Sequence, residues 1–226
     1  ACMIDASDYV NDGKPDLELL NNTIIEKESS PIKWIRIASY YNNIPNCLPM
    51  LSILKDKGYS TTVNLMGMSL ITDEDIMHTA KLLQSSPDID CFYISDSFGN
   101  LTPSYISEIL QKIKFEYSGR LGIHTHDNNG LAYANTICAI ESGIDFIDST
   151  IMGMGRGAGN LRTEQQLLYM VFKLGQSNKN PYELLDVIER WFVPMHKKYC
   201  WGWDFTYMLS AIQNIHPSYC MNLRSS

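Results

Sequence analysis

Two histidines separated by one residue end a short apolar segment. His124 and His126 lie in Leu121-Gly-Ile-His-Thr-His, which is typical of a β-strand, and the next residues are Asp127-Asn-Asn-Gly130. Side chains on a strand alternate between its faces, so both imidazoles should point to the same side, about 7 Å apart along the backbone. Two neutral imidazoles with added oxygen ligands suit Mn²⁺, Co²⁺ or Zn²⁺, and also Mg²⁺ where carboxylates join. The pattern predicts either a divalent metal site or a pair of hydrogen-bonded structural histidines.

A glycine-rich segment follows about thirty residues later. It reads Gly153-Met-Gly-Arg-Gly-Ala-Gly-Asn160 and lies between a predicted strand and a predicted helix. Its glycines loosely match a dinucleotide-binding fingerprint, but the position some twenty residues on is Asn178 rather than an acid. Glycines at every second position also let the backbone pass close to a ligand or a neighbouring strand. We favour this second interpretation, which places Asn160 at the mouth of the next helix; a plain helix cap is the third.

Polar residues end another apolar segment, in Asp96-Ser97-Phe-Gly99. In parallel α/β folds, active sites form at the carboxyl ends of the strands, so Asp96 and Ser97 are available to a substrate there. Both residues are equally suited to capping helices. The predicted strands contain no lysine after Lys33. A Schiff-base aldolase would need such a lysine, so metal chemistry is favoured.

Apolar strand-like segments alternate with amphipathic helical ones about every thirty residues, which predicts a parallel sheet. Six strands are expected, a number that favours an open doubly wound sheet over a (β/α)₈ barrel. After residue 176 the alternation stops, and two aromatic-rich helices are expected in a C-terminal extension. The predicted strands are residues 2–5, 33–38, 61–66, 90–95, 119–125 and 144–150, and the predicted late helices are residues 181–199 and 204–215.

Composition limits the class of protein. The 226 residues are 45% hydrophobic and 19% charged, as expected of a soluble globular protein. The net charge of −7 argues against a nucleic-acid partner, and no apolar run is long enough to span a membrane. Six widely spaced cysteines without a Cys-x-x-Cys motif suit free thiols in a reducing cytosol. A cytoplasmic protein without nucleic-acid or membrane partners is therefore expected.

The histidine and glycine segments together resemble a known family. His124-Thr-His-Asp-Asn-x-Gly-Leu-Ala-x-Ala-Asn135 and Ile147-Asp-x-Thr-Ile-x-Gly-Met-Gly-Arg-Gly-Ala-Gly-Asn-x-x-Thr-Glu164 resemble the HMGL-like (pyruvate carboxyltransferase domain) metal-dependent aldolases, closest in style to the 4-hydroxy-2-oxovalerate aldolases. The family fold is a TIM barrel with added C-terminal helices, which reverses the preference drawn from the strand count. The resemblance predicts a TIM (β/α)₈ barrel lacking its first two β/α units in this chain. Residues 1–176 would contain strands three to eight, and residues 177–226 the helical extension.

The resemblance also implies a chemistry. It predicts class II aldol chemistry, in which a divalent metal ion activates a 2-oxo acid for making or breaking a carbon–carbon bond, with pyruvate as the expected enolate source and an aldehyde as the other reactant. His124 and His126 would be metal ligands, and Asn160 another. Asp96 and Ser97 would help to hold the substrate.

Other family features are less easily located. Tyr207 is the candidate for the catalytic aromatic hydroxyl that the family uses in its C-terminal region. The family's Arg-Asp pair, at the end of the first strand, has no counterpart in this sequence, so the chain is expected to be an incomplete fragment and a poor catalyst alone. The C-terminal helices would contact a second copy or a partner enzyme. Two other classes stay open: a non-catalytic scaffold module of a larger protein, and a dinucleotide-binding oxidoreductase.

Overall fold

A computed structural model describes residues 1–176, 178 and 180–225 of the chain. The chain forms two compact units. Unit 1 consists of residues 1–95, 108–123 and 144–146, and unit 2 of residues 96–107, 124–143 and those from 147 onward.

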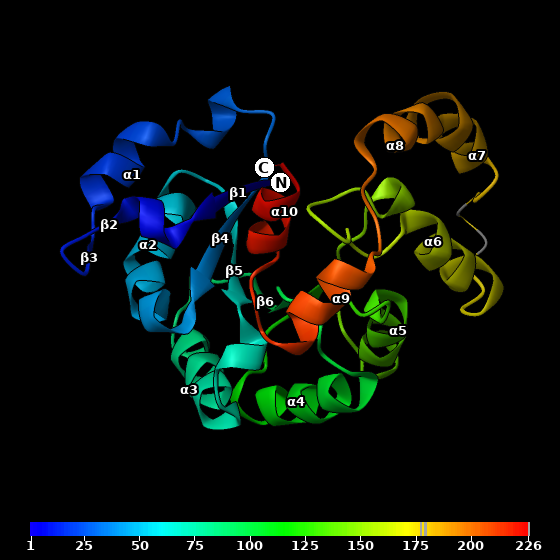
Figure 1. The fold of residues 1–226 in the computed structure, drawn as a ribbon. Helices are drawn as coiled ribbons and strands as arrows, with labels where there is room; N and C mark the ends of the chain where they lie inside the picture. Colours follow the sequence, from blue (N-terminus) through cyan, green and yellow to red (C-terminus); the bar gives the residue numbers. More distant parts are fainter. Residues whose placement is uncertain (177, 179, 226) are drawn as a thin grey trace. The chain divides into compact units, whose positions relative to one another are not determined.

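Six strands form one sheet, most of which lies in unit 1. The strands β1, β4, β5 and β6 pair in parallel and run side by side in Figure 1. The last residues of β6, β7 and β8 belong to unit 2. The six strands are β1 (Cys2–Asp5), β4 (Trp34–Tyr40), β5 (Ser60–Met66), β6 (Cys91–Asp96), β7 (Leu121–Thr125) and β8 (Phe146–Ile147).

The order of the strands in space distinguishes the two predicted architectures. Across the sheet the order is β1-β4-β5-β6-β7-β8, which follows the order along the chain without a reversal. A doubly wound sheet reverses its strand order at the switch point where it binds dinucleotides, whereas successive strands of a (β/α)₈ barrel are neighbours. The predicted fold class is therefore confirmed, with six strands in the positions of the third to eighth of a barrel.

Local sequence features explain where three of the helices begin or end. Thr72 forms a capping box at the start of α3, because its hydroxyl accepts from the backbone N–H of Asp75 while the Asp75 carboxylate accepts from the N–H of Thr72. Gly58 and Gly143 follow α2 and α5 with φ of +85° and +77°. The helices are α1 (Leu17–Thr23), α2 (Ile44–Asp56), α3 (Asp73–Gln84), α4 (Pro103–Glu116), α5 (Ala132–Glu141), α6 (Thr163–Phe172), α7 (Glu183–Val187), α8 (Val193–Tyr199), α9 (Phe205–Ile212) and α10 (Pro217–Ser225).

The core of unit 1 lies where apolar side chains of the strands meet apolar side chains of the helices. The middle residues of β5 and all residues of β6 are buried, so both faces of these strands are covered, as is usual for a parallel sheet. Burying each such side chain contributes roughly 1.5–3 kcal/mol relative to leaving it in water. The main contributors are Ile37, Val63, Leu65, Phe92 and Ile94 from the strands, and Leu51, Leu54, Ile76, Leu83, Ile109 and Ile113 from the helices.

A short hairpin near the N-terminus was not predicted. Strands β2 (Val10–Asn11) and β3 (Lys14–Pro15) pair antiparallel around Asp12-Gly13. Both turn residues have positive φ, 49° and 75°, which identifies the tight turn that favours the sequence Asp-Gly.

Unit 2 contains the late helices. The predicted helix over residues 181–199 is observed as α7, a π-helical turn (Ile188–Phe192) and α8, and the one over 204–215 as α9. The predicted domain boundary begins at residue 177, which lies outside the described residues, and the division into residues 1–176 and 177–226 stays a prediction. Within the described ranges, no helix is long and apolar enough to cross a membrane.

Candidate metal centre

The two histidines of the motif lie on the same side of the chain at the end of β7. The centres of the His124 and His126 rings are 5.0 Å apart, and their planes are inclined by 78°. This agrees with the geometry that strand alternation predicts. A metal about 2.1 Å from one nitrogen of each ring would separate the ring centres by roughly 4.7–5.4 Å, for right-angled to tetrahedral arrangements. The observed separation falls within that range.

His124 is oriented by a carboxylate. Its Nδ1 lies 2.9 Å from Oδ2 of Asp148, and because a carboxylate only accepts, the proton is on Nδ1. The contact follows from the register of the sheet. Leu121 pairs with Asp145, 24 residues later, and His124 pairs with Asp148 at the same spacing. A histidine that donates one ring N–H to a carboxylate presents its other nitrogen, here Nε2, as a fixed lone pair.

His126 is neutral at ordinary pH. Burial lowers the pKa of His126 to about 3, and the Arg156 guanidinium, together with the His124 ring whenever that ring is protonated, acts in the same direction. Only the unprotonated imidazole can bind a metal. Burial therefore keeps this ring in the form that binds.

The glycine segment packs closely around Asn160. Asn160 pairs with His126 in an antiparallel bridge, which directs both side chains to the same side. A Cβ on Gly155 would overlap Nδ2 of Asn160, and a Cβ on Gly153 would lie 2.8 Å from the Asn160 carbonyl oxygen. A Cβ on Gly159 would overlap the carbonyl oxygen of Gly153. These glycines make room for the chain itself, as expected where the backbone passes close to a neighbouring segment.

The amide of Asn160 is satisfied on one side only. Its Nδ2 donates to the carbonyl of Met154 at 3.4 Å, while its Oδ1 is buried without a hydrogen-bond partner. A buried acceptor left unpaired costs about 1–3 kcal/mol. A cation at this position would remove that cost, so the donor set fits a divalent ion held by two imidazole nitrogens and one amide oxygen.

This donor set contains no carboxylate. Among the described residues, no group of three or more His, Cys, Asp or Glu side chains is close enough to hold an ion. Two nitrogens and one oxygen favour borderline ions such as Mn²⁺, Co²⁺ or Zn²⁺. The residues present supply three ligands, and further positions would be left for water, substrate or another donor.

Asp96 is buried at the end of β6. Its Oδ1 accepts from the backbone N–H groups of Asn100 and Leu101 at 3.0 and 3.3 Å, and Nδ2 of Asn135 lies 3.5 Å from its Oδ2. Burial raises the pKa of Asp96 to about 7, although these N–H donors and the charge of His124 oppose the shift. Ser97, the next residue, is 9% exposed. Asp96 therefore fixes the loop after β6 and also carries a proton that titrates near neutral pH.

Tyr207 lies on α9 against the glycine segment. A Cβ on Gly157, where φ is +60°, would lie 3.1 Å from the Tyr207 ring, so the loop and the ring are in close contact. The tyrosine is 7% exposed and belongs to a small buried cluster with Ala158 and Cys220. Its catalytic role stays a prediction.

Sequence reasoning missed two contributors to this centre. Asp148 was not predicted as a site residue, although it follows His124 by 24 residues, the same spacing as the backbone pair Leu121 and Asp145. Asn135 is fully buried on α5, donates to the Leu101 carbonyl at 2.8 Å and approaches Asp96. It lies within the family motif, which was the available signal.

Residues 40–190, two thirds of the chain, match the sequence profile described as HMGL-like. The chain belongs to the HMGL-like family. Among its relatives are 4-hydroxy-2-oxovalerate aldolases from Carboxydothermus hydrogenoformans and Pseudomonas putida. They are 33% and 32% identical over 167 and 168 residues, which is 74% and 73% of this chain and 49% and 48% of those proteins. The chain thus spans about half the length of the curated relatives it matches.

Solved structures share the HMGL-like fold. The N-terminal domain of a protein described as an aldolase from Bacteroides vulgatus superimposes with a TM-score of 0.84 at 32% identity, over 99% of this chain and 71% of that one. The carboxyl transferase domain of Rhizobium etli pyruvate carboxylase, solved with pyruvate, gives a TM-score of 0.68 at 14% identity, over 84% of this chain and 33% of that one. At that identity the second likeness concerns the fold alone.

Proposed function

We propose that this chain contains the metal-binding part of a metal-dependent (class II) aldolase or lyase. The proposed reaction makes or breaks a carbon–carbon bond next to a 2-oxo acid with a pyruvate-type enolate, as in a 4-hydroxy-2-oxovalerate aldolase. The observation that carries the proposal is the pair His124 and His126 beside the unpartnered Oδ1 of Asn160. The names of the relatives support the same reaction class.

In this proposal His124, His126 and Asn160 hold the divalent ion. When bound, the ion supplies Lewis-acid polarisation of the carbonyl group of the 2-oxo acid. Asp148 keeps the His124 ring in one orientation, since it accepts the Nδ1 proton and leaves Nε2 for binding. Burial keeps His126 neutral.

Asp96, Ser97 and Tyr207 are the proposed substrate-facing groups. Because two backbone N–H groups donate to Oδ1 of Asp96, the proton of this carboxyl is expected on Oδ2. With a pKa of about 7, that oxygen can either hold or accept a proton at neutral pH, as a general acid or base requires. Ser97 would add a hydroxyl beside it, and Tyr207 a phenol from α9.

The test begins with metal binding. Isothermal titration of the metal-free protein with Mn²⁺ should give one strong site, which His124→Ala and His126→Ala each abolish. His78→Ala, which removes an imidazole from α3 in unit 1, is the matched control and should leave binding unchanged.

Turnover is the second measurement. Hydroxy-oxo acids are supplied with Mn²⁺ or Co²⁺ to the complete protein that contains this chain, and released pyruvate is coupled to a dehydrogenase. The proposed reaction predicts activity that EDTA removes and that His124→Ala lacks. Pyruvate release that survives both changes would contradict the proposal.

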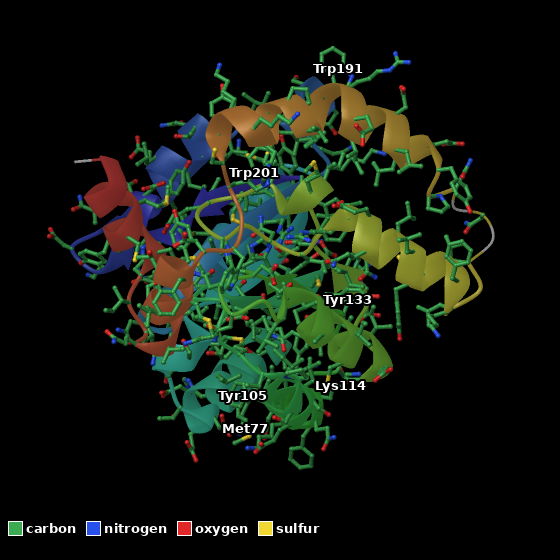
Figure 2. The ribbon with its side chains drawn as sticks, turned by 45° about the vertical axis from the view of Figure 1, so that its right-hand side comes forward. Met77, Tyr105, Lys114, Tyr133, Trp191 and Trp201 are labelled. Carbon is green, nitrogen blue, oxygen red and sulfur yellow. The ribbon has the colours of Figure 1, made fainter. Side chains whose placement is uncertain are left out.

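Location and partners complete the proposal. All six cysteines lie within the described ranges and have free thiols, which supports a cytoplasmic protein. The net charge of −7 supports a small-molecule rather than a nucleic-acid partner. Figure 2 shows Trp191 on the outer side of the helix over residues 183–199. Its side chain is 66% exposed, and other large apolar side chains of the late helices are also exposed. Exposed apolar surface is typical of protein interfaces, so we include contact with a second copy or a partner enzyme in the proposal.

A further inference from the structure

A cavity of about 370 Å³ lies in unit 2 beside the glycine segment. One wall is the loop of residues 154–157, and the opposite walls come from α8, α9, α10 and the segment between α8 and α9. Trp201 is fixed in this wall, because its Nε1–H donates to the carbonyl of Met152 at 3.0 Å. Figure 2 shows Trp201 in the segment that leaves the end of α8.

Most of the cavity wall is apolar. Three methionines line it, Met154, Met195 and Met221, together with the aromatic rings of Tyr199 and Trp201. Methionine side chains are flexible and polarisable, so they adapt to carbon chains of different shapes. A volume of this size suits a small molecule.

One charged side chain lines the cavity, and it is Arg156. It lies in the exposed part of the glycine segment and forms no ion pair within the described part of the chain. A guanidinium presents several N–H donors in a plane, which matches the two oxygens of a carboxylate. An apolar cavity with a single arginine therefore complements a molecule that carries one negative charge on a carbon chain.

We propose that this cavity binds an apolar carbon chain that ends in a carboxylate, with the carboxylate on Arg156 and the chain among the methionine and aromatic side chains. The cavity adjoins the candidate metal centre. Gly155 lines it on one side, and on the other side Gly155 touches the amide of Asn160. Tyr207 also belongs to both, since it lines the cavity and packs on Gly157.

Two kinds of molecule could supply the carboxylate and the apolar chain that fit this cavity. The chain with its carboxylate is either the far end of a substrate that carries a second carboxylate, an assignment that rests on the proposed function, or a separate carboxylic acid bound beside the centre. Both would contact the same side chains of the cavity, and competition with the substrate distinguishes them.

The probe is hexanoate, added to protein with ¹³C-labelled methionine methyl groups. The signals of Met154, Met195 and Met221, assigned by single Met→Leu variants, should shift with a saturating dependence on hexanoate. Hexylamine, which has the same chain with the opposite charge, should not shift them. Arg156→Gln should weaken hexanoate binding about tenfold, the loss expected when a charge-assisted hydrogen bond to the carboxylate is removed.

Arg190→Gln is the matched control, because Arg190 is also exposed but pairs with Asp186 and does not line the cavity. It should leave hexanoate binding unchanged. Equal binding to the Arg156→Gln variant and the parent chain overturns the proposal. Equal shifts with hexylamine, or no shift at saturating hexanoate, also overturn it.

The same titration on His124→Ala separates this inference from the proposed function. Retained hexanoate binding there, with metal binding lost, supports the cavity independently of the metal centre. In turnover assays, competition between hexanoate and the hydroxy-oxo acid assigns the cavity to the far end of the substrate. Binding without competition assigns it to a separate carboxylic acid.

Discussion

Replacing Asp96 by asparagine should make the stability of the protein less dependent on pH. The Asp96 carboxyl is 2% exposed, and burial raises its pKa from 3.8 to about 7. In the unfolded chain the same group ionises near its ordinary value. Between these two values the folded protein holds a proton that the unfolded chain has lost.

The sign follows from this difference. When the pKa of a group is higher in the folded protein than in the unfolded chain, the group stabilises the folded protein fully at pH values below its unfolded pKa. That stabilisation is lost as the pH rises toward the folded pKa. The loss is about 1.4 kcal/mol per pH unit, or about 4 kcal/mol over the roughly three units between 3.8 and 7. The asparagine side chain of the variant has no proton to lose, and its amide is close in shape to the carboxyl. Between pH 5.5 and 7 the unfolding free energy of the variant, relative to that of the parent chain, should therefore rise by about 2 kcal/mol.

Urea unfolding at several pH values, from 5.5 to 8, measures this change for the parent chain and Asp96→Asn. Subtracting the two unfolding free energies at each pH removes the contributions of all groups that titrate alike in both proteins. Asp56→Asn, which changes an exposed carboxylate at the end of α2, is the control for the substitution itself. If the difference in unfolding free energy between Asp96→Asn and the parent chain did not change with pH, burial would not raise the pKa of Asp96. A difference that favours the parent chain as pH rises would show that the N–H donors from Asn100 and Leu101 outweigh burial.

Two further predictions concern the metal centre. Asp148→Ala should weaken Mn²⁺ binding 10–100-fold in isothermal titration without abolishing it, because His124 keeps its ligand atom and loses only its orienting acceptor; unchanged affinity would argue against that role. Gly159→Ala should lower the unfolding free energy by about 3 kcal/mol or more, since φ is +83° and the new Cβ meets the carbonyl oxygen of Gly153. Gly13→Ala, at φ +75° with open space around it, should cost only about 1 kcal/mol; equal costs in thermal unfolding would refute the close packing of the loop.

The periodic parts of the fold were predictable because strand and helix periods are local properties of the sequence. The capping box at Thr72 and the glycines that follow α2 and α5, Gly58 and Gly143, are local features of the same kind. The hairpin at Asp12-Gly13 carried the strongest short-range turn signal and was overlooked. Strand β8 was predicted over residues 144–150 but is limited to Phe146–Ile147, because Thr150 instead bridges to Arg162 across the glycine loop.

The architecture and the site required more than periodicity. Six strands suit either an open sheet or part of a barrel, and only strand order, a property of the folded chain, distinguishes them. Strand alternation predicted that His124 and His126 share a side. The unpartnered Oδ1 of Asn160 and the pKa of Asp96 depend on burial by residues distant in sequence, which local patterns do not reveal.

The burial of His126 has a consequence for the number of protons exchanged when an ion binds. An ordinary histidine is partly protonated near pH 6.5 and must release that proton to the buffer when it becomes a ligand. The His126 ring, with its pKa near 3, carries no such proton between pH 5 and 8. Its share of the binding heat is therefore independent of the ionisation enthalpy of the buffer, and mild acidification can displace an ion only through the other donors.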